Sequence, residues 1–259
     1  MGERVTLITG ASAGIGSELA RVFAAHGHRL ALTARREDRL AALAQEIAAK
    51  GGPAPLVIPC DLTSPDAGAT IEAALSAADV ELDYLVNNAG FGLFGKAVQL
   101  DRAEQLDMIS VNVRALTELS LRFSDQLIRN KGGILNLGSV AGFLPGPGMA
   151  VYYASKAYVI SFTEALRKEL APHGVRVTVL CPGPVPSEFQ ARAGFKPGVD
   201  SVILNVPPKA VAEAGYRGLM ADKRVVLPGL GIKIVPFMLR WFPRGFILDA
   251  VGRLQLRRN

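Results

Sequence analysis

The sequence predicts a single α/β domain with a doubly wound parallel sheet and helices on both faces. Three observations predict it. Short apolar runs alternate with stretches of helical periodicity along most of the chain. A glycine-rich turn lies between the first apolar run and the first helical stretch. Glycine or polar residues follow the end of nearly every run, and in a parallel sheet those ends share one edge, where ligands bind.

Size and composition fit one such domain. The chain has 259 residues, of which 49% are apolar and 20% charged. Its net charge is +6, with much of the basic excess in the C-terminal tail, and basic residues interleave with aromatic ones only there, so we expect no nucleic-acid partner. Its two cysteines suggest neither a disulfide framework nor a metal site, and we expect a cytoplasmic protein without a metal. No apolar run reaches the roughly 18 residues of a membrane span.

The first strand is predicted at residues 4–9, and the first helix at 17–27. Between them, Gly10, Gly14 and Gly16 allow close approach of a ligand to the backbone, and the free N–H groups of the helix start suit a pyrophosphate. The spacing G-x-x-x-G-x-G differs from the G-x-G-x-x-G dinucleotide fingerprint. We therefore predict a phosphate-binding turn from its position between strand and helix.

The second strand is predicted at 29–35, with a helix at 35–51. In NAD-binding units an acidic residue at the end of this strand holds the ribose hydroxyls, whereas an arginine there accommodates the 2′-phosphate of NADP. Here Arg35 and Arg36 follow Ala34, and no acidic residue stands at the strand end. The pair predicts a preference for NADP; the alternative is that both are simple surface charges.

Further strands are predicted at 54–63, 81–90, 132–140 and 175–183, with a last one at 225–229. Helices are predicted at 64–79, 99–130, 150–172 and 207–221. The strand ends carry Asp61, Asn87 with Asn88, Ser139 and Pro182, so the sheet should bring these residues to one edge. Consecutive asparagines can also simply make a turn.

Tyr152 and Lys156 stand at the start of the helix predicted at 150–172, four residues apart and therefore on one face. A free tyrosine has a pKa of about 10. A nearby ammonium favours the phenolate, and we expect Lys156 to lower the pKa of Tyr152 and make it a general acid/base. The alternative is an ordinary tyrosine and lysine on a surface helix.

Taken in order, these motifs resemble the short-chain dehydrogenase/reductase family in its short, single-domain form. The match comprises TGASAGIG (9–16), NNAG (87–90), Asn112, Ser139, Tyr152-x-x-x-Lys156 and Pro182-Gly183, and extends over about residues 4–190. The resemblance implies a Rossmann-type fold, NADP(H) as cofactor and a homodimer or homotetramer. It also implies an oxidoreductase that interconverts a ketone and a secondary alcohol.

The resemblance assigns roles residue by residue. Tyr152 is the expected general acid/base, Lys156 holds the nicotinamide ribose, Ser139 binds the substrate oxygen, and Asn112 holds a relay water by kinking its helix. The alternative for Asn112 is a satisfied core amide. The expected cofactor contacts, besides Tyr152 and Lys156, are Gly10, Ser12, Gly14, Ile15, Gly16, Arg35, Arg36, Asp61, Leu62, Asn88, Ala89, Gly90, Pro182, Gly183, Val185 and Ser187. The family often has threonine near position 187, so this serine departs mildly from its pattern.

The substrate pocket is expected from three loops with apolar side chains, which favour a hydrophobic ketone: a 3-oxoacyl chain, a steroid-like ring or an aryl ketone. These side chains are Phe91, Leu93, Phe94, Phe143, Leu144, Met149, Phe189 and Phe195. The loop 187–206 is expected to act as a mobile lid. The alternative to an enzyme is a catalytically silent NADP-binding sensor or scaffold, which would not need Ser139, Tyr152 and Lys156.

The C-terminal segment 229–259 is expected to be an extension of the domain 1–228. It mixes apolar and aromatic residues with six arginines and lysines, a composition that suits a helix at a membrane interface. The alternatives are a cover over the substrate site and a subunit contact.

Overall fold

We describe the protein from a computed structural model, for residues 3–186, 188–194, 206–229, 231–234, 241 and 243–256. The seven strands form one parallel sheet in the order β3-β2-β1-β4-β5-β6-β7. The strands are β1 (Glu3–Thr9), β2 (Leu30–Ala34), β3 (Leu56–Pro59), β4 (Val80–Asn87), β5 (Gly133–Leu137), β6 (Arg176–Leu180) and β7 (Val225–Val226). The predicted doubly wound fold is confirmed.

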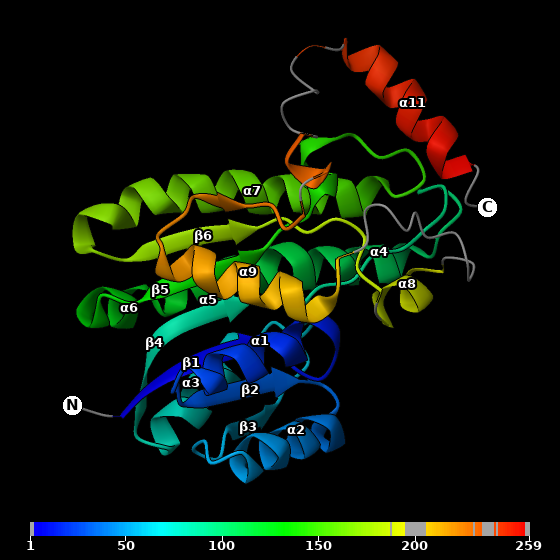
Figure 1. The fold of residues 1–259 in the computed structure, drawn as a ribbon. Coiled ribbons are helices and arrows are strands. Elements are labelled where there is room, and N and C mark those ends of the chain that lie inside the picture. The colour runs from blue at the N-terminus through cyan, green and yellow to red at the C-terminus, as the bar shows by residue number, and fades with distance from the viewer. Residues whose placement is uncertain are drawn as a thin grey trace.

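Helices cover both faces of the sheet (Figure 1). One face packs against α1 (Gly14–Ala25), α2 (Glu37–Ala49) and α9 (Pro208–Met220), and the other against α3 (Ala67–Ala77), α4 (Arg102–Ile109), α5 (Leu116–Arg122), α6 (Ser124–Asn130) and α7 (Ala150–Leu170). Neighbouring strand residues serve opposite faces. Leu7 and Leu85 belong to one core, whereas Ile8 and Val86 belong to the other. The strands therefore read as continuous apolar runs, as expected when both faces of a sheet are buried.

The helix predicted at 99–130 is interrupted. A π-helical turn, Ser110–Ala115, separates α4 from α5, and Phe123 separates α5 from α6. The cause at the first break is Asn112, which is 1% exposed and turns its side chain towards the backbone of Phe91. The register of the apolar face shifts at this turn, which a uniform helical period could not predict.

Of the described helices, α8 (Glu188–Ala193) and α11 (Arg244–Leu256) lie outside these layers, and α8 caps the carboxyl edge of the sheet. In Figure 1, α11 stands apart from the sheet at the upper right, and Gly252 approaches Pro147 in the loop before α7. Within the described residues, no helix combines the length and the apolar character that a membrane crossing requires. The predicted division into 1–228 and 229–259 stays a prediction.

Candidate active site

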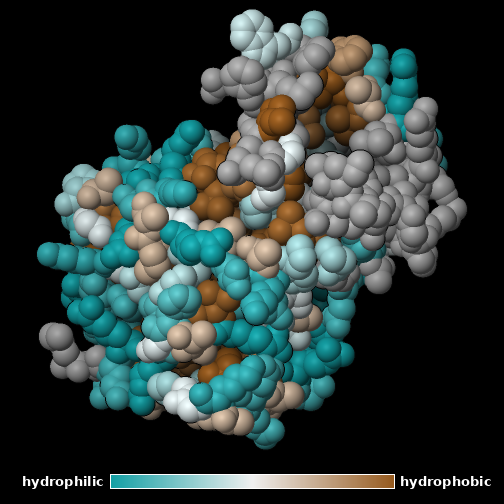
Figure 2. Space-filling model, in the orientation of Figure 1, coloured by the Kyte–Doolittle hydropathy of each residue, from teal (hydrophilic) through white to brown (hydrophobic). Residues whose placement is uncertain are grey.

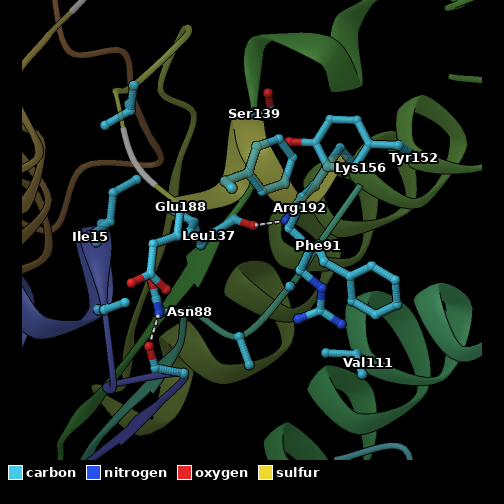
Figure 3. A pocket seen from close by; sticks show the side chains of 18 of the residues that line it. Ile15, Asn88, Phe91, Val111, Leu137, Ser139, Tyr152, Lys156, Glu188 and Arg192 are labelled. Atoms are coloured by element: carbon cyan, nitrogen blue, oxygen red, sulfur yellow. Dashed lines mark hydrogen bonds between the residues drawn. The ribbon is translucent and has the colours of Figure 1, made fainter. Parts of the chain in front are cut away.

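The carboxyl edge of the sheet opens into one cavity of about 930 Å³. It receives residues from the ends of β1, β2, β4, β5 and β6 and from α7 and α8 (Figure 3). The predicted site residues on its wall are Gly10, Ser12, Gly14, Ile15, Gly16, Arg35, Arg36, Asp61, Leu62, Asn88, Ala89, Gly90, Ser139, Tyr152, Lys156, Pro182, Gly183 and Val185. Asn112 lies behind the wall, and Ser187 falls outside the described residues.

The glycine-rich turn is shaped by its lack of side chains. Gly10 and Gly14 have positive φ angles of +64° and +58°, which glycine adopts without strain. A Cβ on Gly16 would lie 2.2 Å from the Gly10 oxygen and 2.4 Å from Asn88 Nδ2. Asn88 Nδ2 donates to the carbonyl oxygens of Thr9 (2.9 Å) and Gly10 (3.2 Å), so the end of β4 fixes the start of this turn. The turn leaves the N-terminus of α1 facing the cavity, as a phosphate site requires.

The two arginines after β2 are both exposed, and both line the cavity. Arg36 Nη2 donates to Ser12 Oγ at 3.2 Å and forms an ion pair with Glu188 Oε2 at 2.8 Å. The side chain of Arg36 is therefore already directed at the glycine-rich turn, where a 2′-phosphate contact was predicted. Leu62 is buried, while Asp61 is exposed and accepts the Thr63 N–H at 3.0 Å.

Ser139 and Tyr152 meet at the inner end of the cavity. Ser139 follows β5 and caps a short 3₁₀ turn, where its Oγ accepts the Ala141 N–H at 3.1 Å. Tyr152 stands in the first turn of α7, and its hydroxyl lies on the side of Ser139 (Figure 3). Burial raises the pKa of Tyr152 to about 12, and the hydrogen bond with Ser139 acts in the opposite direction. In this state the tyrosine is a protonated hydroxyl, suited to donate a proton.

The expectation that Lys156 lowers the pKa of Tyr152 is wrong for this structure. Lys156 Nζ donates to the carbonyl oxygen of Leu137 at 2.7 Å and lies 5.9 Å from the centre of the Tyr152 ring. Burial lowers the pKa of Lys156 itself to about 8. The two groups share one helix face as predicted, but desolvation outweighs any effect of the ammonium on the phenol.

Asn112 acts as a strut between three elements. Its side chain accepts the Phe91 N–H (3.1 Å) and donates to the Phe91 carbonyl oxygen (3.0 Å) and to Ser155 Oγ (3.0 Å). The side chain therefore matches the alternative expectation, a buried amide whose hydrogen bonds are satisfied within the core. The predicted distortion of its helix is present as the π-helical turn. A relay water at this position stays a prediction.

The helix α8 closes one side of the cavity, in a segment where a loop was expected. The ring centres of Phe189 and Tyr152 lie 5.4 Å apart, and the Ala193 carbonyl oxygen accepts the Phe94 N–H at 2.8 Å. The Arg192 guanidinium lies 4.1 Å from the centre of the Phe91 ring. Partial burial lowers the pKa of Arg192, while the negative charges of Glu104 and Asp61 act in the opposite direction.

Sequence reasoning missed Glu188 and Arg192 as site residues. The signal available was their spacing of four, which places two opposite charges on one helical turn within a segment read as irregular. Of the predicted apolar wall, the residues that line the cavity are Phe91, Leu93, Leu144, Met149 and Phe189. Phe94 and Phe143 do not line it, and Phe195 lies outside the described residues. Among described side chains, no group of three or more potential metal ligands is assembled.

A doubly wound parallel sheet, with a glycine-rich turn and a Tyr–Lys pair at its carboxyl edge, defines the class of dinucleotide-dependent oxidoreductases. Comparison with known proteins agrees. The profile of the short chain dehydrogenase family matches residues 4–196. The chain belongs to the short-chain dehydrogenase/reductase family of oxidoreductases.

Three relatives illustrate the range of the family around this chain. Sulfoacetaldehyde reductase 2 of Chromohalobacter salexigens is 41% identical over 188 residues, which are 71% of this chain and 74% of the relative. A short-chain dehydrogenase from Sphingobium yanoikuyae, solved with NADPH, is 33% identical with a TM-score of 0.82, over 94% of both chains. A bulky-bulky ketone specific alcohol dehydrogenase from Comamonas testosteroni is 29% identical with a TM-score of 0.78, over 95% of this chain and 94% of that one.

Proposed function

We propose that the protein is an NADP(H)-dependent oxidoreductase that interconverts a hydrophobic ketone and its secondary alcohol, with Tyr152 as general acid/base. One observation carries the proposal: Ser139, Tyr152 and Lys156 line the same cavity as the glycine-rich turn. A sensor or scaffold would have no use for a buried lysine and a tyrosine–serine pair beside its cofactor. The test is oxidation of NADPH in the presence of hydrophobic ketones and 3-oxoacyl thioesters.

The residues on the cavity wall fit the cofactor. The glycine-rich turn and the N-terminus of α1 would hold the pyrophosphate, and Asn88, Ala89 and Gly90 would flank the adenosine ribose. A preference for NADP is supported by Arg35 and Arg36 after β2 and by the NADPH bound to the Sphingobium relative. When bound, the nicotinamide supplies or accepts the hydride.

The protein's own groups would handle the oxygen of the substrate. In the reduction, Ser139 Oγ donates a hydrogen bond to the carbonyl oxygen, where negative charge develops. Tyr152 would donate its hydroxyl proton to that oxygen, and the hydride would add to the carbonyl carbon, so that the ketone gains one hydrogen at oxygen and one at carbon. Lys156, whose Nζ donates to the Leu137 carbonyl oxygen on the same cavity wall, would hold the nicotinamide ribose.

The substrate class is proposed from the cavity wall near Tyr152. Phe91, Leu144, Met149 and Phe189 present apolar surface there, which suits a ketone with large apolar substituents. The Comamonas relative is named for bulky-bulky ketones, in agreement with such a pocket.

Arg192 favours a second candidate, a ketone or aldehyde that also carries an anionic group. Its guanidinium faces the same cavity without a described carboxylate partner, and the Chromohalobacter relative is named for sulfoacetaldehyde, whose sulfonate is such a group. If the substrate is anionic, Arg192→Met should lower kcat/KM for 4-acetylbenzoate about ten- to a hundredfold, the effect of losing a charge-assisted hydrogen bond. The uncharged methyl ester should lose less than threefold. Equal losses for acid and ester would rule out this role.

Two surfaces support proposals about partners. Leu106, Ile109 and Leu121 on α4 and α5 and Tyr158 on α7 are exposed and apolar, which supports self-association through these helices. The exposed Trp241 and Phe246 lie in the C-terminal segment beside Arg244 and Arg253, and Figure 2 shows apolar surface gathered around α11. This segment supports peripheral membrane contact.

We expect the protein to float with anionic liposomes, and we expect this flotation to be lost when residues 232–259 are deleted. Unchanged flotation after the deletion would contradict membrane contact through the tail.

A further inference from the structure

Glu188, at the start of α8, forms an ion pair with Arg36, one of the two arginines that the proposed function assigns to the 2′-phosphate of NADP. Its Oε2 lies 2.8 Å from Arg36 Nη2, and its Oε1 lies 3.4 Å from Arg39 Nη1. The same Arg36 nitrogen donates to Ser12 Oγ in the glycine-rich turn. Figure 3 shows Glu188 on the side of the pocket that carries Ile15 of this turn.

A carboxylate and a phosphate make the same kind of contact with a guanidinium, a charge-assisted hydrogen bond between N–H and an anionic oxygen. The hydrogen bond from Arg36 lowers the pKa of Glu188, so the carboxylate is ionised at neutral pH. A 2′-phosphate that reaches Arg36 must therefore either displace Glu188 or sit beside its negative charge. NADH, which has a hydroxyl at this position, leaves the pair intact.

We propose that Glu188 sets the balance between NADPH and NADH by competing with the 2′-phosphate for Arg36. This inference rests on the proposed function and makes that cofactor preference adjustable from α8. No acidic residue stands at the end of β2, where such a group usually acts. Here the acidic group comes instead from a segment about 150 residues further along the chain, in sequence next to the Phe189 that packs on Tyr152.

The competition would act at one end of α8 only. The other end is held by the hydrogen bond from Phe94 N–H to the Ala193 carbonyl oxygen, and Phe189, the residue after Glu188, packs on Tyr152. Displacement of Glu188 can therefore occur without loss of the helix from the cavity.

The test is Glu188→Gln, which keeps the shape of the side chain and removes its charge. Dissociation constants for NADPH and NADH are measured by the fluorescence of the bound cofactor. We expect Kd for NADPH to fall about three- to tenfold and Kd for NADH to change less than twofold, because only the 2′-phosphate meets the carboxylate. Glu72→Gln is the matched control: it also removes one charge from an ion pair, the pair with Arg122 on α5, and should change neither constant.

Two further measurements separate this inference from its rivals. In an Arg36→Met background, Glu188→Gln should no longer change the affinity for NADPH, because the guanidinium for which the carboxylate and the 2′-phosphate compete is absent. The probes 2′,5′-ADP and 5′-ADP isolate the 2′-phosphate from the rest of the cofactor, and only the former should bind more tightly to Glu188→Gln. Weaker binding of NADPH to this variant would mean that Glu188 supports Arg36, and equal changes for both probes would mean a general charge effect; either result overturns the inference. Neither result would bear on the proposed role of Tyr152, which is tested separately by measuring turnover.

Discussion

Replacing Tyr152 with phenylalanine is expected to lower kcat for ketone reduction by about 10²–10⁴-fold, the usual contribution of a positioned general acid. The phenyl ring keeps the contact with Phe189 and loses only the hydroxyl that faces Ser139. Binding of NADPH should therefore change less than about threefold. Steady-state kinetics and a fluorescence titration of NADPH, on the same preparation, measure the two quantities.

Tyr158→Phe is the matched control for this variant. Tyr158 lies on the same helix, α7, but faces outward, where its hydroxyl lies 2.8 Å from Thr117 Oγ1. It should keep wild-type turnover.

The pH dependence of alcohol oxidation gives a second check on Tyr152, because the oxidation needs the phenolate. Burial holds the pKa of Tyr152 at about 12, so oxidation should accelerate as the pH rises from 7 to 10 in wild type. A Tyr152→Phe variant that keeps either its turnover or this acceleration would refute the assignment.

Gly16→Ala is expected to impair folding and cofactor binding together. The new methyl group would lie 2.2 Å from the Gly10 oxygen and 2.4 Å from Asn88 Nδ2, so a backbone segment must move. Overpacking of this kind costs about 1–3 kcal/mol, which for a chain of this size lowers Tm by roughly 2–12 °C. The group displaced is the turn itself, so affinity for NADPH should fall more than about tenfold.

The control for Gly16→Ala is Gly245→Ala in α11. Its added Cβ has no described atom within 4 Å, and alanine favours a helix. We expect unchanged or slightly raised Tm and unchanged affinity. If Gly16→Ala bound NADPH as wild type does, the glycine-rich turn could not be the pyrophosphate site.

The sheet and most of the site could be predicted because both depend on local patterns. Apolar runs such as 29–35 and 175–183 are long enough to be strands and are bounded by clear turns. The residues after them reach one cavity because parallel strands end at one edge. Gly10, Arg36, Ser139 and Tyr152 therefore line the same cavity, as the strand ends predict, and their roles there stay predictions.

What escaped prediction depends on contacts between distant segments. The family resemblance predicted a kink at Asn112, but not that the kink is a π-helical turn in which Asn112 pairs with the backbone of Phe91, 21 residues earlier. The pKa of Tyr152 is governed by how deeply the surrounding loops bury it, and spacing along one helix contains no such information. Glu188 and Arg192 gain their roles from Arg36 and Phe91, which only the folded chain brings near.

The hydrogen bonds between Asn88 and the glycine-rich turn also have a consequence for folding while the chain is being synthesised. The Asn88 N–H donates to Thr9 Oγ1 across 79 residues of sequence, and its side chain holds the carbonyl oxygens on which the turn is built. A ribosome that adds about 5–20 residues per second needs several seconds to span that interval. During this time β1 and its turn have emerged without the strand that completes them. A nascent chain halted before residue 88 should therefore not be retained on an NADP affinity matrix, however well its first helix has formed.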